Sequence, residues 1–148
     1  MPDFEDAYCP VAVTNGPRGA RPVKILAIDD DPNVTKAFQR RFAAYGVEVL
    51  QAFHGMQGMS LAVTEKPDLI ITDLVMPHSY GQGDDVVQCL KGREETRGIP
   101  IIVLTGQPNG YLKRQLRNLG ADAYLTKPVD FEDLLELVGR FINLEQPE

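Results

Sequence analysis

The segment DLIITDLVMP, residues 68–77, decides the fold of this chain. Its centre is an apolar run that ends on a carboxylate at Asp73 and is closed by Pro77. A strand buried inside a parallel sheet has this form, an apolar run without polar alternation. Because open α/β sheets bind ligands outside the carboxyl ends of their strands, the sequence predicts that Asp73 lies at a functional site.

Three further apolar runs end on polar side chains that suit the same site. The runs and the residues that follow them are Val23–Ile28 with Asp29 and Asp30, Ile101–Leu104 with Thr105, and Ala123–Thr126 with Lys127. The carboxyl ends of parallel strands meet at one edge of a sheet. We therefore expect an acid cluster, a hydroxyl group and a lysine to converge on one pocket around Asp73.

Helical patterns alternate with the apolar runs, which predicts an α/β domain whose parallel sheet is covered on both faces. The expected helices run from about Pro32 to Tyr45, and over Met56–Thr64, Asp85–Lys91, Tyr111–Asn118 and Phe131–Ile142, and Val47–Ala52 is a further strand. Gly46 is expected to end the first helix, and Lys66-Pro67 the second, because a residue before proline disfavours helix.

The chain is expected to form one domain. Residues 1–22 contain several prolines and glycines without periodic apolar residues, so we predict a flexible N-terminal extension there. Residues 23–143 form the predicted domain and 144–148 a C-terminal tail, with no output domain expected.

The composition restricts the class of protein. A net charge of −6 and a pI of about 4.9 argue against direct binding to nucleic acid or to an anionic membrane. The first residues lack the basic and apolar regions of a signal peptide, which favours a cytoplasmic protein. Cys9 and Cys89 have no paired spacing, so both are interpreted as free thiols, with Cys89 on the apolar side of its helix.

The four strand ends together carry a family resemblance. The motifs are Ile28-Asp29-Asp30, Ile71-Thr72-Asp73 with Met76-Pro77, Leu104-Thr105-Gly106 and Thr126-Lys127-Pro128, and Lys127 follows Thr105 by 22 positions. In this order and spacing, residues 21–142 resemble the receiver domain of two-component response regulators, in a stand-alone form like the chemotaxis regulators. The resemblance implies a flavodoxin-like, doubly wound, five-stranded parallel sheet of order 2-1-3-4-5.

The resemblance also implies a phosphoacceptor site. Asp73 would take a phosphoryl group from a phosphohistidine with the help of Mg²⁺. Asp30 and Asp73 would bind the metal directly, the backbone carbonyl of Val75 would be another ligand, and Asp29 would act through water. Lys127 would pair with Asp73 and later with a phosphoryl oxygen, and its bond to the following proline would be cis.

A conformational switch and a set of partners follow from the same resemblance. Thr105 would bond the new phosphoryl oxygen, and Tyr124 would rotate into the space that it leaves, changing the surface of the fourth helix, fifth strand and fifth helix. The expected partners are a histidine kinase or histidine phosphotransfer protein and an unidentified downstream protein. We expect a monomer or weak dimer that is a signalling domain and not a turnover enzyme.

Residues next to these motifs receive simpler interpretations. Asp31 is expected to help start the first helix, and His54 to lie on the surface at the start of the second. His78 has no partner at metal-ligand spacing, so no chemical role is expected for it. The loop over residues 78–85 is about two residues longer than in most receivers by alignment, which affects the geometry beside Asp73.

Two alternative functions remain. A haloacid-dehalogenase-like phosphatase also uses an aspartate nucleophile with Mg²⁺, but it needs a second acid two residues later, where this chain has Val75. A receiver that signals without phosphate is the other alternative, although such proteins usually lack some of the residues that are complete here. A flavodoxin-like cofactor site is disfavoured, because three consecutive aspartates after the first strand would repel a flavin phosphate.

Overall fold

The five strands form one parallel sheet in the order β2-β1-β3-β4-β5, which confirms the predicted topology. The computed structural model describes residues 22–73, 83–106, 114, 117–118 and 120–144. The strands are β1 (Val23–Ile28), β2 (Val47–Ala52), β3 (Leu69–Asp73), β4 (Ile101–Thr105) and β5 (Ala123–Thr126). The strand order reverses between β1 and β3, and ligands of doubly wound sheets bind at such a point.

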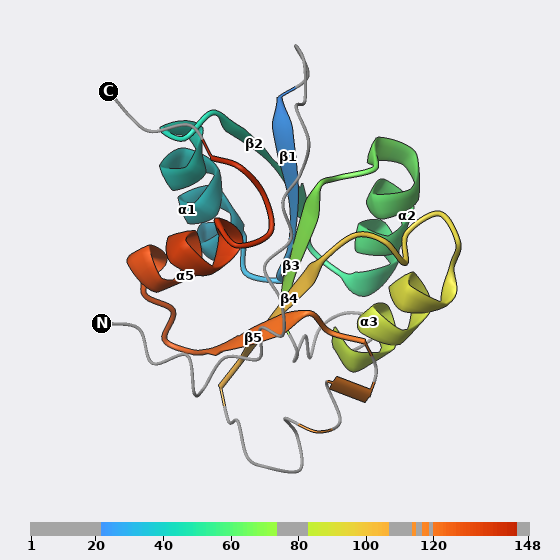
Figure 1. Ribbon diagram of the computed structural model, residues 1–148. Helices are drawn as coiled ribbons and strands as arrows, with labels where there is room; N and C mark the ends of the chain where they lie inside the picture. The colour runs from blue at the N-terminus through green and yellow to red at the C-terminus, as the bar shows by residue number, and fades with distance from the viewer. Residues whose placement is uncertain (1–21, 74–82, 107–113, 115–116, 119, 145–148) are drawn as a thin grey trace.

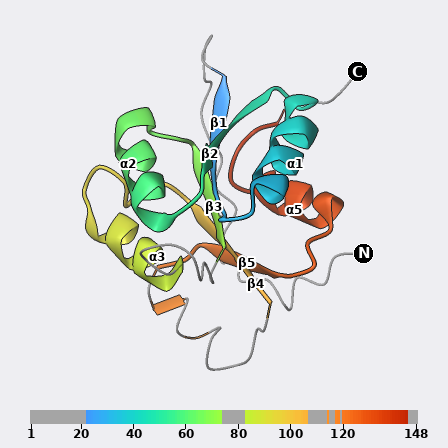
Figure 2. The same cartoon turned by 180° about the vertical axis from the view of Figure 1, so that it is seen from behind.

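Helices cover both faces of the sheet (Figures 1 and 2). One face carries α1 (Pro32–Ala43) and α5 (Phe131–Val138), and the other carries α2 (Gly55–Glu65) and α3 (Gly83–Gly92). The strands between them are almost wholly apolar, and every residue of β3 and β4 is buried. This is the expected consequence of covering a parallel sheet on both sides.

Two apolar layers hold the helices on the sheet. Between the sheet and the α1–α5 layer, the rings of Phe42 and Phe131 meet edge to face with centroids 4.9 Å apart. The guanidinium of Arg41 lies 4.4 Å from the centre of the Phe131 ring and covers its outer side. On the other face, Val87 and Leu90 of α3 are fully buried in the second layer. Packing on both faces therefore fixes the sheet, and with it the edge formed by the carboxyl ends of the strands.

The helix ends follow from local sequence. Asp31 caps the start of α1, and His54 caps the start of α2 from an exposed position, as expected for both. Lys66 adopts a left-handed conformation (φ 48°) at the end of α2, just before Pro67. Gly46 (φ 73°) makes the turn from α1 into β2, where a side chain would be strained.

Several sequence-based expectations are wrong in detail. The last helix ends at Val138 and not at Ile142, because Gly139 occupies the C-cap and the chain continues in turns, although Ile142 remains buried. Cys89 is exposed, because the apolar side of α3 is formed by its neighbours in the second layer. The helix predicted over residues 111–118 lies largely outside the described residues, as do residues 78–82 of the predicted loop. The third helix begins at Gly83 and not at Asp85, so the end of the predicted loop is helical.

Gly58 allows α2 to approach β1 closely. A Cβ atom added at this glycine would clash with Ile28 Cδ1 and would lie 2.8 Å from Ile28 Cγ1. Glycine costs about 1 kcal/mol relative to alanine inside a helix. In return, the missing side chain lets α2 pack directly on Ile28, the residue that precedes the acid cluster.

We predict that Gly58→Ala lowers the free energy of unfolding by about 1–3 kcal/mol, the usual cost of overpacking, despite the better helix propensity of alanine. Urea denaturation measures the change. Gly92→Ala is the matched control, since nothing lies within 4 Å of a Cβ at that position. Ile28→Val removes the nearest atom and should restore part of the loss. Equal effects of the two alanine variants would contradict this explanation.

Candidate functional site

Three carboxylates converge at the carboxyl edge of the sheet. Asp29 and Asp30 follow β1, and Asp73 is the last residue of β3, the strand next to β1. One ligand oxygen from each lies within 4.8 Å of the others. Asp29 and Asp73 are buried, and Asp30 is half-buried. The structure thus brings together the acid cluster that the sequence predicts.

Lys127 extends into this cluster from the end of β5. Its Nζ lies 3.0 Å from Asp73 Oδ2 and 3.9 Å from Asp29 Oδ2. Its backbone N–H donates to the carbonyl of Thr105 at 2.8 Å, so the strand pairing continues up to the lysine. The peptide bond to Pro128 is cis, as the family resemblance implied. The predicted pairing of Lys127 with Asp73 is therefore present in the unmodified protein.

The environment of Asp29 is the most perturbed part of the site. Burial raises the pKa of this carboxyl from 3.8 to about 6, the hydrogen bond from Asp31 opposes the rise, and the nearby charge of Asp73 adds to it. Among the residues that the structure describes, Asp29 Oδ2 has no hydrogen-bond partner, since Lys127 lies beyond hydrogen-bond distance. This is a buried acceptor in a region of concentrated negative charge.

The donor set fits a divalent cation. The cluster holds three carboxylates against the one ammonium of Lys127 in the described part of the chain, so negative charge is in excess. Carboxylate oxygens are the ligands that Mg²⁺ prefers, and the unpartnered oxygen of Asp29 faces this environment. The predicted ligand Val75 lies outside the described residues.

Backbone contacts that sequence reasoning missed hold Asp29 in place. Its N–H donates to the carbonyl of Ala52 at 3.0 Å, and its Oδ1 accepts from the N–H of Asp31 at 2.9 Å. The first contact joins the end of β1 to the end of β2, and the second joins the acid cluster to the start of α1. The pair Asp31-Pro32, a helix cap followed by a proline, is the sequence signal that could have indicated the second contact.

Thr105 and Tyr124, the predicted switch residues, lie on one face of the sheet. Val103 is the register partner of Tyr124, and Thr105 follows it two residues later on the same side of β4. Thr105 is 3% exposed and Tyr124 is 1% exposed within the layer under α2 and α3. The two residues therefore lie on neighbouring strands and on the same face of the sheet.

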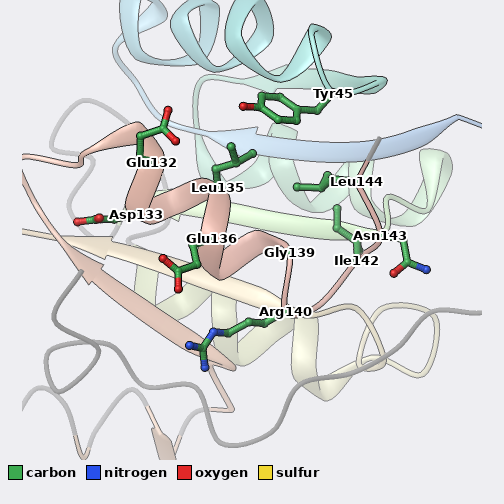
Figure 3. Close-up of a pocket in the computed structure, with 10 residues that line it drawn as sticks. All are labelled: Tyr45, Glu132, Asp133, Leu135, Glu136, Gly139, Arg140, Ile142, Asn143 and Leu144. Atoms are coloured by element: carbon green, nitrogen blue, oxygen red, sulfur yellow. The ribbon is translucent and has the colours of Figure 1, made fainter. Parts of the chain in front are cut away.

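Two cavities lie near α1. A cavity of about 380 Å³ between α1 and the segment after β5 extends to Lys127, and its lining is Asn33, Val34, Ala37, Phe38, Leu104, Lys127, Pro128 and Val129. A larger one, about 780 Å³, lies between Tyr45 and α5, and Figure 3 shows Glu132, Asp133 and Glu136 projecting from that helix. None of the predicted site residues lines the larger cavity, so the size of a cavity does not identify the predicted site in this protein.

In the described part of the chain, no helix has the length and apolar character that a membrane span requires.

Comparison with known proteins agrees with this geometry. The family model of the response regulator receiver domain matches residues 25–139. The chain is 36% identical to Protein PilH of Pseudomonas aeruginosa over 116 residues, which cover 78% of this chain and 94% of PilH. It is 41% identical to the DNA-binding dual master transcriptional regulator RpaA of Synechocystis over 81% of this chain, and it spans 49% of RpaA.

Solved structures show the same fold. The chemotaxis protein CheY4 of Vibrio cholerae matches with a TM-score of 0.76 and 27% identity, over 82% of this chain and 99% of that one. The non-phosphorylated receiver domain of HemR from Leptospira biflexa matches with a TM-score of 0.73 and 25% identity, over 85% and 98% of the two chains. With an acid cluster and a lysine at the sheet edge and a family match over most of its length, this chain belongs to the response regulator receiver domain family of two-component signalling.

Proposed function

We propose that this receiver domain accepts a phosphoryl group on Asp73 from a phosphohistidine of a histidine kinase or histidine phosphotransfer protein. One observation carries the proposal. Asp73 Oδ2 lies 3.0 Å from Lys127 Nζ, at a sheet edge where two further carboxylates converge. An acceptor carboxylate beside a fixed cation and an acidic cation site is the arrangement that phosphoryl transfer needs.

In the proposed reaction, a carboxylate oxygen of Asp73 attacks phosphorus and the bond from phosphorus to the histidine nitrogen breaks. The products are an aspartyl phosphate and a histidine that takes up a proton. Lys127 neutralises charge on Asp73 beforehand and on a phosphoryl oxygen afterwards. Asp73 is 7% exposed, so the reaction occurs where electrostatic interactions are less weakened by water.

The acid cluster would hold Mg²⁺, which supplies the positive charge that lets an anionic phosphoryl group approach three carboxylates. Asp30 and Asp73 are the proposed direct ligands with the Val75 carbonyl, and Asp29 is proposed to act through water. The unpartnered Oδ2 of Asp29 supports this assignment, because a buried carboxylate oxygen without a partner is costly.

Phosphorylation would be read out through Thr105 and Tyr124. The Thr105 hydroxyl would donate to a phosphoryl oxygen, and Tyr124 would move into the space that Thr105 leaves. Both residues lie on the face of the sheet that α2 and α3 cover, which supports coupling between them. The surface that includes β5 and α5 would then bind a downstream protein.

The proposal also covers nucleic-acid binding, cellular location, oligomeric state and enzymatic activity. RpaA is described as DNA-binding, but the matching region covers only 49% of that protein, and this chain is acidic overall, so no direct nucleic-acid contact is proposed. We propose a cytoplasmic signalling domain, monomeric or weakly dimeric, with residues 23–143 as the functional unit. We also propose that the protein is not a turnover enzyme. A phosphatase of the haloacid-dehalogenase type needs a general acid two residues after its aspartate nucleophile, and Val75 occupies that position here.

We predict that Asp73→Asn reduces Mg²⁺-dependent phosphorylation to background, because the amide keeps the shape of the side chain but is not a nucleophile. Labelling by a phosphorylated kinase or by acetyl phosphate measures the effect. Asp130→Asn is the control, since it neutralises an exposed aspartate that caps α5 and should label like the wild type. Wild-type labelling of Asp73→Asn would show that the acceptor is another residue.

A second prediction separates the two acids after β1. Asp30→Ala should weaken Mg²⁺ binding by more than about a hundredfold and Asp29→Ala by about tenfold, because outer-sphere ligands usually contribute less than direct ones. Calorimetric titration with Mg²⁺ gives both affinities. Unchanged affinity in Asp30→Ala would rule out direct coordination by that residue.

A third prediction uses the raised pKa of Asp29. Its folded pKa of about 6 exceeds the ordinary aspartate value of 3.8, so in Mg²⁺-free buffer the folded state binds an extra proton between these values. Stability therefore falls as the pH rises through this window, and above about pH 6 the loss is complete. Asp29→Asn cannot titrate but keeps an acceptor for the Asp31 N–H.

Asp29→Asn should accordingly stabilise the metal-free protein by about 1–3 kcal/mol at pH 7.5 and by much less at pH 4. Thermal unfolding in the presence of a chelator measures both values. A stabilisation of equal size at the two pH values would show that the burial of Asp29 does not disfavour its charged form.

A further inference from the structure

The first turn of α1 is held by Asp31. Its Oδ1 accepts from the N–H of Asn33 at 2.9 Å, and its carbonyl accepts from the N–H of Val34 at 3.1 Å. Pro32 occupies the first helical position, where its nitrogen needs no partner. The backbone of Asp31 (φ −94°, ψ 110°) is therefore fixed by its own side chain and by the helix that follows.

The same residue also holds the acid cluster. The N–H of Asp31 donates to Asp29 Oδ1 at 2.9 Å. With that oxygen engaged, the other oxygen of Asp29 lies 3.9 Å from Lys127 Nζ and is buried, without a hydrogen-bond partner among the described residues. The direction of the Asp31 N–H thus determines which oxygen of Asp29 remains free to face the acid cluster and Lys127.

We propose that Asp31 is a positioning residue for the metal site. Its side chain caps Asn33, the cap fixes the direction of its backbone N–H, and this N–H orients the carboxylate of Asp29. The inference rests on the proposed function, because it concerns the site assigned to Mg²⁺. Asp31 itself is not proposed as a ligand, since its side chain is exposed and is bonded to the helix.

Two simpler roles compete with this one. Asp31 could only stabilise α1 as an N-cap, or it could only add negative charge near the cation. The substitutions Asp31→Asn and Asp31→Ala distinguish them. Both remove the charge, but asparagine keeps an oxygen that accepts from Asn33, whereas alanine does not. The difference in Mg²⁺ affinity between the two variants therefore reports the cap alone.

Calorimetric Mg²⁺ titration of the full chain at constant ionic strength is the test. We expect Asp31→Ala to bind Mg²⁺ roughly fivefold more weakly than Asp31→Asn, which is less than the effect of about tenfold expected for losing Asp29 itself, because Asp31 acts through Asp29. Hydrogen exchange of the residue-31 amide in the metal-free protein should also be faster in Asp31→Ala. If the alanine variant melts below the assay temperature, Asp31→Gly takes its place, because glycine is tolerated at an N-cap but has no accepting side chain.

Asp130 provides a matched cap without a link to the cluster. Its Oδ1 accepts from the N–H groups of Glu132 and Asp133 at 2.8 and 3.4 Å, at the start of α5. Asp130→Ala should lower the melting temperature relative to Asp130→Asn and leave Mg²⁺ affinity unchanged within about twofold. Such a separation would show that loss of a cap by itself does not weaken metal binding.

The outcomes distinguish this inference from the proposed function. If the wild type binds Mg²⁺ and the two Asp31 variants bind it equally, the positioning role is wrong while the metal site stands. The role is also wrong if Asp130→Ala weakens Mg²⁺ binding as much as Asp31→Ala does. If the wild type does not bind Mg²⁺ at all, the proposed metal site fails and this inference fails with it.

Discussion

The fold of this protein has to hold three like charges within 4.8 Å of one another at the edge of a sheet. Left alone, such carboxylates repel each other and resist burial. In the described chain, Lys127 offsets part of this repulsion through its contacts with Asp73 and Asp29. The energy needed for the rest comes from the apolar layers on both faces of the sheet. The apolar core therefore stabilises a sheet edge whose charges, taken alone, destabilise the fold.

Backbone hydrogen bonds make this arrangement stiff. The end of β1 is joined to the end of β2 through Ala52, and the end of β4 is joined to Lys127 at the end of β5. The backbone of Asp29 and that of Lys127 are thus each attached to a neighbouring strand, and the Asp29 side chain is attached to the start of α1. In the proposed function, such prearranged groups would need little reorganisation during the reaction.

The family resemblance implied the sheet order. The apolar runs that end on polar residues predicted the convergence of Asp29, Asp30, Asp73 and Lys127, because the carboxyl ends of parallel strands meet at one edge of the sheet. The sequence did not predict the contact of Asp29 with Ala52, since a backbone carbonyl leaves no residue-type signal. The contact with Asp31 was also missed, although the helix cap Asp31-Pro32 could have indicated it. Sequence reasoning placed Cys89 on the wrong side of α3, because the phase of a helix is set by packing. It extended the last helix past Gly139, because it did not recognise that glycine as the C-cap. The roles proposed for Thr105 and Tyr124 come from the family resemblance, since their residue types alone do not indicate a switch.

The close approach of α2 to β1 has a consequence for the evolution of this family. Gly58 packs on Ile28, and the next residue along the chain is Asp29. A larger side chain at position 58 is compatible with the same helix position only if position 28 becomes smaller. Among relatives, the two positions should therefore vary together, with their combined volume nearly constant. An alignment would then carry a packing signal directly beside the acid cluster, where invariance is usually attributed to chemistry alone.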